Sequence, residues 1–249
     1  MAFLILAFRF LTIVPVPGRE AMGPGALGRA GWWFPLVGLM LGAVLALLDR
    51  VVDRLFPPLL SSLLVVSAWK VATGGIHLDG LADCLDGLAG PDVESRLAIM
   101  RDSRIGVFGA AGLVLCFLLA LTALAELPSP ARTAALLLAP VVGRLAPLLV
   151  GAWFRPASPH RGVGADFLGA VSRWAGPVHL GIAAGLAAAL LGTGGLLVVA
   201  AAIIGALAWS AFMAWRLRGV TGDVLGASVE LAELGVLLTT AALAHQKLL

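Results

Sequence analysis

The sequence contains few charged residues for its length. Of 249 residues, 17 are Lys or Arg and 14 are Asp or Glu, so charged side chains make up 12% of the chain, against about a quarter in soluble domains. Hydrophobic residues make up 60%. A soluble fold of this size needs a more charged surface. The composition therefore excludes an ordinary cytosolic enzyme and a disordered chain, and it indicates an integral membrane protein.

Other absences narrow the class further. Two cysteines, Cys84 and Cys116, are too few for a disulfide scaffold. The net charge is only +3, and no stripe of clustered Lys and Arg is present, so we expect no nucleic-acid partner. The apolar start, Met1 to Val14, lacks a basic segment before it and a small-residue cleavage site after it. We expect it to stay in the protein, as a helix at the membrane interface.

Seven apolar segments approach the roughly 20 residues that a membrane-spanning helix needs. They are residues 31–48, 57–74, 105–125, 133–153, 176–191, 194–215 and 229–244. We therefore predict an all-α polytopic membrane bundle of about seven helices, with six to eight as the range. No repeat or linker divides the chain, so we predict one domain over residues 1–249.

Seven crossings sort the connecting segments onto two sides of the membrane. One side receives residues 15–30, 75–104, 154–175 and 216–228, with ten Arg, whereas the other receives residues 49–56, 126–132, 192–193 and the C-terminal tail, with four Arg or Lys. The positive-inside rule places the first, longer set in the cytoplasm.

A first polar motif, residues 73–87, follows the second apolar segment. Asp79, Asp83 and Asp86 are spaced i, i+4 and i+7, which places them on one face of a helix. Like charges on one face destabilise a surface helix, whereas a hard cation such as Mg²⁺ prefers carboxylate ligands. We predict that the three bind a metal; the alternative is a solvated acidic helix. His77 is a candidate general base or ligand, or else a buried interfacial histidine.

A second motif, residues 101–106, precedes the third apolar segment. Arg101 and Arg104 are candidates to bind phosphate oxygens, which match the guanidinium group. Ser103 is a candidate hydroxyl donor, and Asp102 is a further candidate ligand. The alternative is a basic collar at the membrane surface.

A third motif, residues 216–233, leads into the last apolar segment. Asp223 is our candidate for a metal ligand or a general base, and Thr221 is a candidate for substrate binding. Glu230 and Glu233 enter the membrane, where unpaired carboxylates are costly. They are expected to face a cavity and pair with metal, Arg or Lys70; the alternative is an internal ion pair that holds the bundle together. The loop over residues 158–167 is a fourth, weaker candidate.

Carboxylates and arginines at one membrane face suit phosphoryl or nucleotidyl transfer. The sequence has no Walker A motif, no H-E-x-x-H motif and no G-x-S-x-G motif, so those classes of ATPase, zinc protease and hydrolase are excluded. The residues favour a metal-dependent membrane transferase acting on a phosphate or pyrophosphate substrate. A transporter with an ion site is the competing class.

The whole chain resembles cobalamin synthase, the adenosylcobinamide-GDP ribazoletransferase family. The resemblance rests on residues 10–17, 34–38, 77–87, 101–106 and 219–227. It implies an enzyme of the bacterial cytoplasmic membrane that depends on Mg²⁺. A hydroxyl of α-ribazole, or of its 5′-phosphate, would attack the phosphorus attached to cobinamide and release GMP. In this reading Asp79, Asp83, Asp86 and Asp223 bind the metal, and Asp223 or His77 is the base.

A CDP-alcohol phosphatidyltransferase is the alternative enzyme. Residues 83–87 match the start of its acidic motif, but Pro91 stands where that motif has Arg, and the second half of the motif does not follow. A secondary transporter is less favoured, because its repeats are absent from the sequence.

Overall fold

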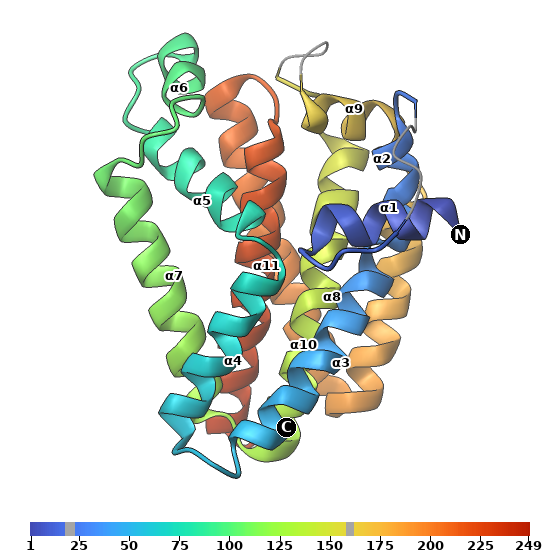
Figure 1. Cartoon of the computed structure of the whole chain (residues 1–249), viewed down its shortest axis with the longest axis vertical. Coiled ribbons are helices and arrows are strands. Elements are labelled where there is room, and N and C mark those ends of the chain that lie inside the picture. Colours follow the sequence, from blue (N-terminus) through green and yellow to red (C-terminus); the bar gives the residue numbers. More distant parts are fainter. Residues whose placement is uncertain (18–22, 158–161) are drawn as a thin grey trace.

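The computed structural model of the chain describes residues 1–17, 23–157 and 162–249. In the described residues the regular structure is helical, apart from one isolated β-bridge between Pro156 and Val220. The long helices run side by side along the longest axis of the molecule, as Figure 1 shows. The predicted all-α bundle is confirmed.

The helices follow the predicted apolar segments closely. The long ones are α3 (Phe34–Val52), α7 (Val107–Glu126), α8 (Ser129–Trp153), α10 (Ala175–Leu217) and α11 (Gly222–His245). The shorter ones are α1 (Ala2–Leu11), α2 (Ala26–Ala30), α4 (Pro58–Ala72), α5 (Ile76–Gly87), α6 (Val93–Ile99) and α9 (Val163–Ala170), with a 3₁₀ turn at Gly31–Trp33. Helix α1 lies across the bundle, as expected of an interfacial helix (Figure 1).

Among the residues that the structure describes, five helical segments are long and apolar enough to cross a membrane, and a sixth is added if α4 and α5 count as one bent span. The 43 residues of α10 would reach about 65 Å if straight, twice the thickness of the bilayer core. Gly192 breaks this helix with φ 60° and ψ −148°, and the backbone of Ala187 lies against Gly195. The chain therefore reverses at Gly192, and the two halves match the fifth and sixth predicted crossings.

Helix α8 is the central helix of the bundle. In the most apolar 18-residue stretch of α8, 89% of residues are buried, whereas in that of α7 only 28% are. Helix α7 exposes large apolar side chains on its outer face, as a lipid-facing helix does. Gly38 and Gly42 let α3 approach the backbone of α8 closely, because a Cβ at either position would meet α8 carbonyl groups. Small residues four apart are typical of such membrane helix contacts.

Helix α5 leaves the axis of α4 at an angle of 89°. The bend follows from Gly74 and Gly75, which have φ values of 63° and 69°, a conformation that costs glycine little. The turn carries α5 across the start of α11. A Cβ on Gly80 would lie 2.7 Å from the carbonyl oxygen of Asp223. A Cβ on Gly226 would lie 3.5 Å from the Cα of His77. Glycines thus bring the first and third polar motifs into direct contact.

Candidate active site

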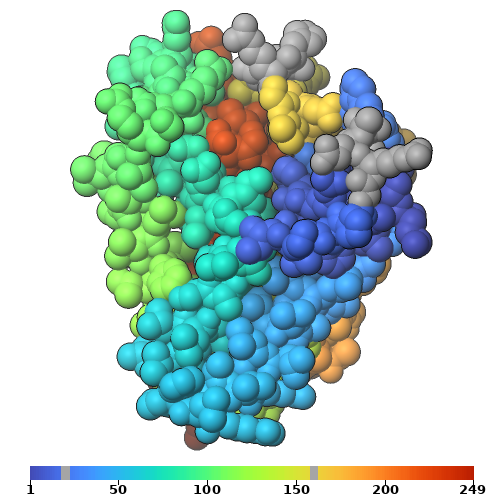
Figure 2. Space-filling model, viewed as in Figure 1, coloured from blue at the N-terminus to red at the C-terminus, as the bar shows by residue number. Residues whose placement is uncertain are grey.

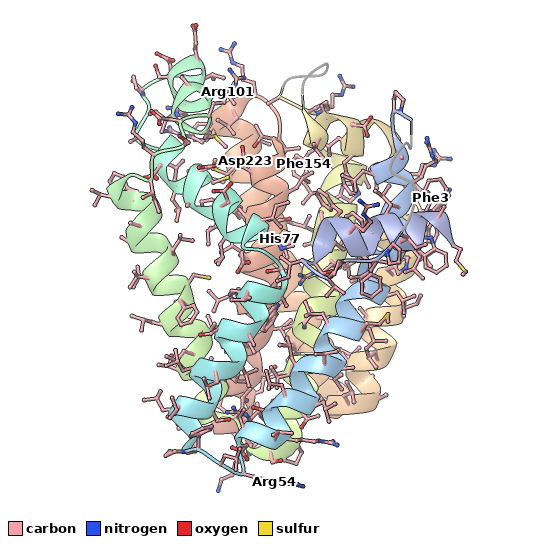
Figure 3. The ribbon with its side chains drawn as sticks, viewed as in Figure 1. Phe3, Arg54, His77, Arg101, Phe154 and Asp223 are labelled. Atoms are coloured by element: carbon pink, nitrogen blue, oxygen red, sulfur yellow. The ribbon has the colours of Figure 1, made fainter. Side chains whose placement is uncertain are left out.

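The three polar motifs meet at one end of the bundle. His77 on α5 and Asp223 on α11 lie near each other, with Arg101 above them and Arg54 at the opposite end (Figure 3). In Figure 2 the orange-red start of α11 is visible between the green α5–α6 region and the yellow α9. The sequence prediction that these motifs share one face of the molecule is therefore met for His77, Asp223 and Arg101.

Two adjoining pockets occupy this end. The inner cavity has a volume of about 240 Å³, and its lining includes His77, Asp79, Arg144 and Asp223. The outer pocket, of about 410 Å³, is lined by Arg101, Thr221 and Asp223 among others. Asp223 lines both pockets, so it stands where a group bound in one meets a group bound in the other.

The start of α11 is positioned by its own cap and by a neighbouring segment. The Thr221 hydroxyl accepts a hydrogen bond from the backbone N–H of Val224 at 3.3 Å and donates one to the Asp223 carboxylate at 3.2 Å. The backbone N–H of the preceding residue, Val220, donates to the carbonyl oxygen of Arg155 at 2.9 Å, and the Val220 carbonyl oxygen accepts from the N–H of Ala157 at 2.9 Å. Asp223 is thus held by a helix N-terminus, where the helix dipole favours a negative charge.

Within the part of the chain that the structure describes, the carboxylates of Asp79, Asp83 and Asp223 have no cationic partner. The negative charges of Asp79, Asp223 and Asp86 act on the Asp83 carboxylate. No ion pair within the described ranges involves Asp79, Asp83 or Asp223. Their oxygen atoms are the donors that Mg²⁺ prefers. However, no group of three His, Cys, Asp or Glu side chains converges into a metal cluster in that part of the chain. A Mg²⁺ ion that keeps water and substrate phosphate as ligands needs only one or two carboxylates, and the donor set fits that case.

Asp86 has a different environment from the other carboxylates. It is 9% exposed, and its two oxygen atoms accept hydrogen bonds from the backbone N–H groups of Gly106 at 2.7 Å and Gly109 at 2.8 Å. These groups open α7 and have no capping side chain of their own. Asp86 therefore caps α7 from another helix and ties the second motif to the first. Sequence reasoning missed this contact, because only the capless Gly106 hinted at it. That Asp86 also binds a metal stays a prediction.

The second motif divides into two parts. Arg101 lines the outer pocket. Arg104 instead forms an exposed ion pair with Asp102 at 2.5 Å. Hydrogen bonds from the Arg104 guanidinium and its backbone N–H lower the pKa of Asp102 to about 2. Ser103 is exposed and lines neither pocket, so substrate binding by Ser103, Asp102 and Arg104 stays a prediction.

Glu230 and Glu233 belong to a buried network of four charges below the inner cavity. Lys70 lies 2.5 Å from Glu230 and 2.9 Å from Glu233, and Glu233 also pairs with Arg144. The expected pairing of these glutamates with Lys70 and with Arg is confirmed, but neither glutamate lines the inner cavity or the outer pocket, so the alternative of an internal ion pair fits them better. Two positive and two negative side chains make the network neutral, which the low dielectric of a membrane bundle favours.

The inner cavity also contains three phenylalanines, of which only Phe167 lay in a segment that the sequence analysis named as a candidate. Phe10, Phe34 and Phe167 line it, and their rings form a stack with centroid spacings of 6.0 and 5.6 Å. The fourth candidate loop contributes Gly164 and Phe167, whereas its residues 158–161 lie outside the described part of the chain. Asp166 in this loop accepts a hydrogen bond from the backbone N–H of Gly25 at 2.6 Å, which positions α9.

Fold and site define a polytopic membrane protein with a carboxylate- and arginine-lined site at one end. Comparison with known proteins gives the family. The family model described as cobalamin-5-phosphate synthase matches residues 3–241, and the chain belongs to this family. No solved structure matches the chain.

Curated relatives carry one name, adenosylcobinamide-GDP ribazoletransferase. The chain is similar to that of Pseudomonas paraeruginosa, with 42% identity over 96% of this chain and 97% of the relative. The protein of Novosphingobium aromaticivorans is 37% identical over 95% of each chain, and that of Acetivibrio thermocellus is 35% identical over 92% of each. The family resemblance seen in the sequence motifs is confirmed.

Proposed function

We propose that this protein is an adenosylcobinamide-GDP ribazoletransferase, a membrane-bound transferase of the bacterial cytoplasmic membrane with its site on the cytoplasmic side. The observation that carries the proposal is the position of Asp223 between the two pockets. A two-substrate transfer needs the acceptor and the phosphate donor to meet at one point. Near-full-length relatives carry the name of this activity.

In the proposed reaction a hydroxyl of α-ribazole attacks the phosphorus attached to cobinamide. The new P–O bond joins ribazole to cobinamide, the bond to the second phosphate breaks, and GMP leaves. The hydroxyl proton passes to Asp223, with His77 as the alternative base. Arg101 faces the outer pocket, where its guanidinium binds phosphate oxygens as the charge on the transferring group changes.

One or two of the carboxylates of Asp79, Asp83 and Asp223 would hold Mg²⁺, which when bound neutralises charge on the pyrophosphate. The support is chemical: these carboxylates repel one another and have the oxygen donors that a hard cation takes. Among the described residues that line the two pockets, Arg144 belongs to the buried charge network. Arg101 is the only other Arg or Lys in these linings, so it is the remaining positive charge near the three carboxylates.

The test is GMP release from adenosylcobinamide-GDP by purified protein in detergent, with and without α-ribazole and with and without Mg²⁺. We expect release to need both additions. Asp83→Ala should reduce release at least about 100-fold, since it removes a carboxylate that would hold the Mg²⁺ ion, and the ion stabilises the negative charge on the transferring group. Asp53→Ala is the matched control, because Asp53 is exposed at the far end of α3. Turnover that survives in folded Asp83→Ala would contradict the metal assignment. Absence of release by folded wild-type protein would redirect attention to CDP-diacylglycerol as substrate.

A further inference from the structure

The inner cavity contains buried hydrogen-bond donors that have no partner. Arg144 is fully buried and lines the cavity. One of its terminal nitrogens pairs with Glu233, but its Nε and the other terminal nitrogen, Nη2, have no hydrogen-bond partner. The Nδ1 atom of His77, a residue that is 6% exposed, also lacks one. Buried polar atoms are rarely left unpaired, because each costs free energy. The unpaired Arg144 nitrogens can only donate, so at a cavity wall they indicate a ligand that accepts hydrogen bonds.

The charge of the surroundings identifies the kind of acceptor. Lys70 and Arg144 already balance Glu230 and Glu233, and Asp79 adds a negative charge at the cavity wall. An anionic group here would leave the buried region with excess negative charge, which is costly in a low dielectric. The ligand group that meets Arg144 is therefore uncharged and carries a lone pair.

The walls and the volume identify the rest of the ligand. The stack of Phe10, Phe34 and Phe167 supplies flat apolar surface, which suits an aromatic ring. The cavity of about 240 Å³ is smaller than the roughly 300–1,000 Å³ of drug-sized ligand sites. It is large enough for a bicyclic base and too small for a corrin ring.

We propose that the inner cavity is the acceptor subsite, in which the uncharged aromatic base of the ribazole nucleoside packs on the phenylalanine stack and its unprotonated ring nitrogen accepts a hydrogen bond from Arg144. This assignment rests on the proposed function. It places the sugar hydroxyls toward Asp223, at the boundary with the outer pocket, and leaves the corrinoid donor outside the cavity.

The chain offers a matched control for Arg144. Arg132 is a second buried arginine of α8, 12 positions away, and it too pairs with a carboxylate, that of Asp49 at 2.6 Å. Arg132 lines neither pocket of the candidate site. Arg144→Lys and Arg132→Lys therefore make the same chemical change in two buried ion pairs, of which only one faces the cavity.

The experiment measures binding of radiolabelled α-ribazole by equilibrium dialysis, and GMP release as a second readout. Its probes are α-ribazole and the analogue in which the unprotonated ring nitrogen is replaced by C–H. Wild-type protein should bind the analogue about tenfold or more weakly, as expected for one lost hydrogen bond to a charged donor. Arg144→Lys should bind the two nucleosides equally and raise the KM for α-ribazole without changing that for adenosylcobinamide-GDP. Arg132→Lys should discriminate between them as wild type does.

A second pair of variants keeps the test decisive if Arg144→Lys fails to fold. Phe167→Ala should weaken α-ribazole binding, whereas Phe108→Ala, at an exposed position of α7, should leave it unchanged. The proposal is overturned if Arg144→Lys or Phe167→Ala binds α-ribazole as wild type does, or if GMP displaces α-ribazole competitively. These failures differ from failure of the proposed function, which would appear as wild-type protein that binds α-ribazole but releases no GMP.

Discussion

The two ends of the bundle differ in how many hydrogen-bond partners they give to a buried arginine. Arg132 donates to Asp49, Ser61 and Ser62 and to the carbonyl oxygen of Leu124, at distances from 2.6 to 3.3 Å. Arg144, at the other end of α8, pairs with Glu233 and leaves two nitrogens without a partner. The satisfied cluster closes one end of the bundle, and the unsatisfied one lines a cavity beside the acidic residues.

The difference also teaches how to interpret charge at membrane depth. Both arginines are buried charges of the kind that marks functional sites in membranes. The count of satisfied donors distinguishes these two arginines: Arg132 is fully paired, whereas Arg144 leaves two nitrogens unpaired at a cavity wall. The following variants test this distinction.

The largest effect on stability is expected at the satisfied end. Asp49→Asn removes the partner of Arg132 and leaves a buried positive charge, which costs about 3–5 kcal/mol. The free energy of unfolding should fall by that amount in a denaturant titration in detergent. GMP release per folded molecule should stay at the wild-type level, since Asp49 lines neither pocket of the candidate site.

An apolar replacement provides the control for this prediction. Asp49→Leu combined with Arg132→Met should recover most of the lost stability, because removing both charges also removes the cost of burying them. If Asp49→Asn lowered GMP release per folded molecule, the satisfied cluster would have a functional role and the contrast between the two ends would fail.

A smaller effect is expected where α5 crosses α11. Gly80→Ala places a Cβ 2.7 Å from the carbonyl oxygen of Asp223, whereas Gly226→Ala meets nothing closer than 3.5 Å. Overpacking typically costs about 1–3 kcal/mol, and here relief requires Asp223 to move. Gly80→Ala should therefore lower both thermal stability and kcat, and Gly226→Ala should lower kcat much less. Equal kcat values in the two variants would show that the spacing of α5 and α11 does not position the site.

The fold was largely predictable from the sequence, and the site only in part. The seven apolar segments correspond to α3, α4, α7, α8, the two halves of α10, and α11, with ends that differ by up to seven residues. Burial in a membrane dictates the length of such helices. The reversal within residues 175–217 was predicted as well, as two crossings over residues 176–191 and 194–215. The assignment of residues 75–104 and 216–228 to one side of the membrane correctly placed Asp79, Asp83 and Asp223 at one end.

What the sequence did not supply are contacts between distant helices. Arg144 lies 67 positions from His77, and nothing in the local pattern says that both line one cavity. The i, i+7 spacing of Asp79 and Asp86 likewise suggested one shared role, whereas the structure turns Asp86 toward α7. Helical periodicity fixes the face of a residue, but the neighbour that covers the face follows from packing.

Asp86 provides the smallest and most discriminating prediction, because it belongs to the acidic motif by sequence and to the satisfied class by its hydrogen bonds. Asp86→Ala should cost about 0.5–2 kcal/mol, as the loss of a helix cap does, measured as a lowered free energy of unfolding. GMP release should fall only modestly and keep its wild-type dependence on Mg²⁺ concentration. If Asp86 is instead a metal ligand, the Mg²⁺ concentration for half-maximal release should rise at least tenfold at little cost in stability. The same measurement on Asp83→Ala gives the reference for a metal ligand. Comparing the two variants shows whether Asp79, Asp83 and Asp86 all bind the metal or whether Asp86 only stabilises the fold.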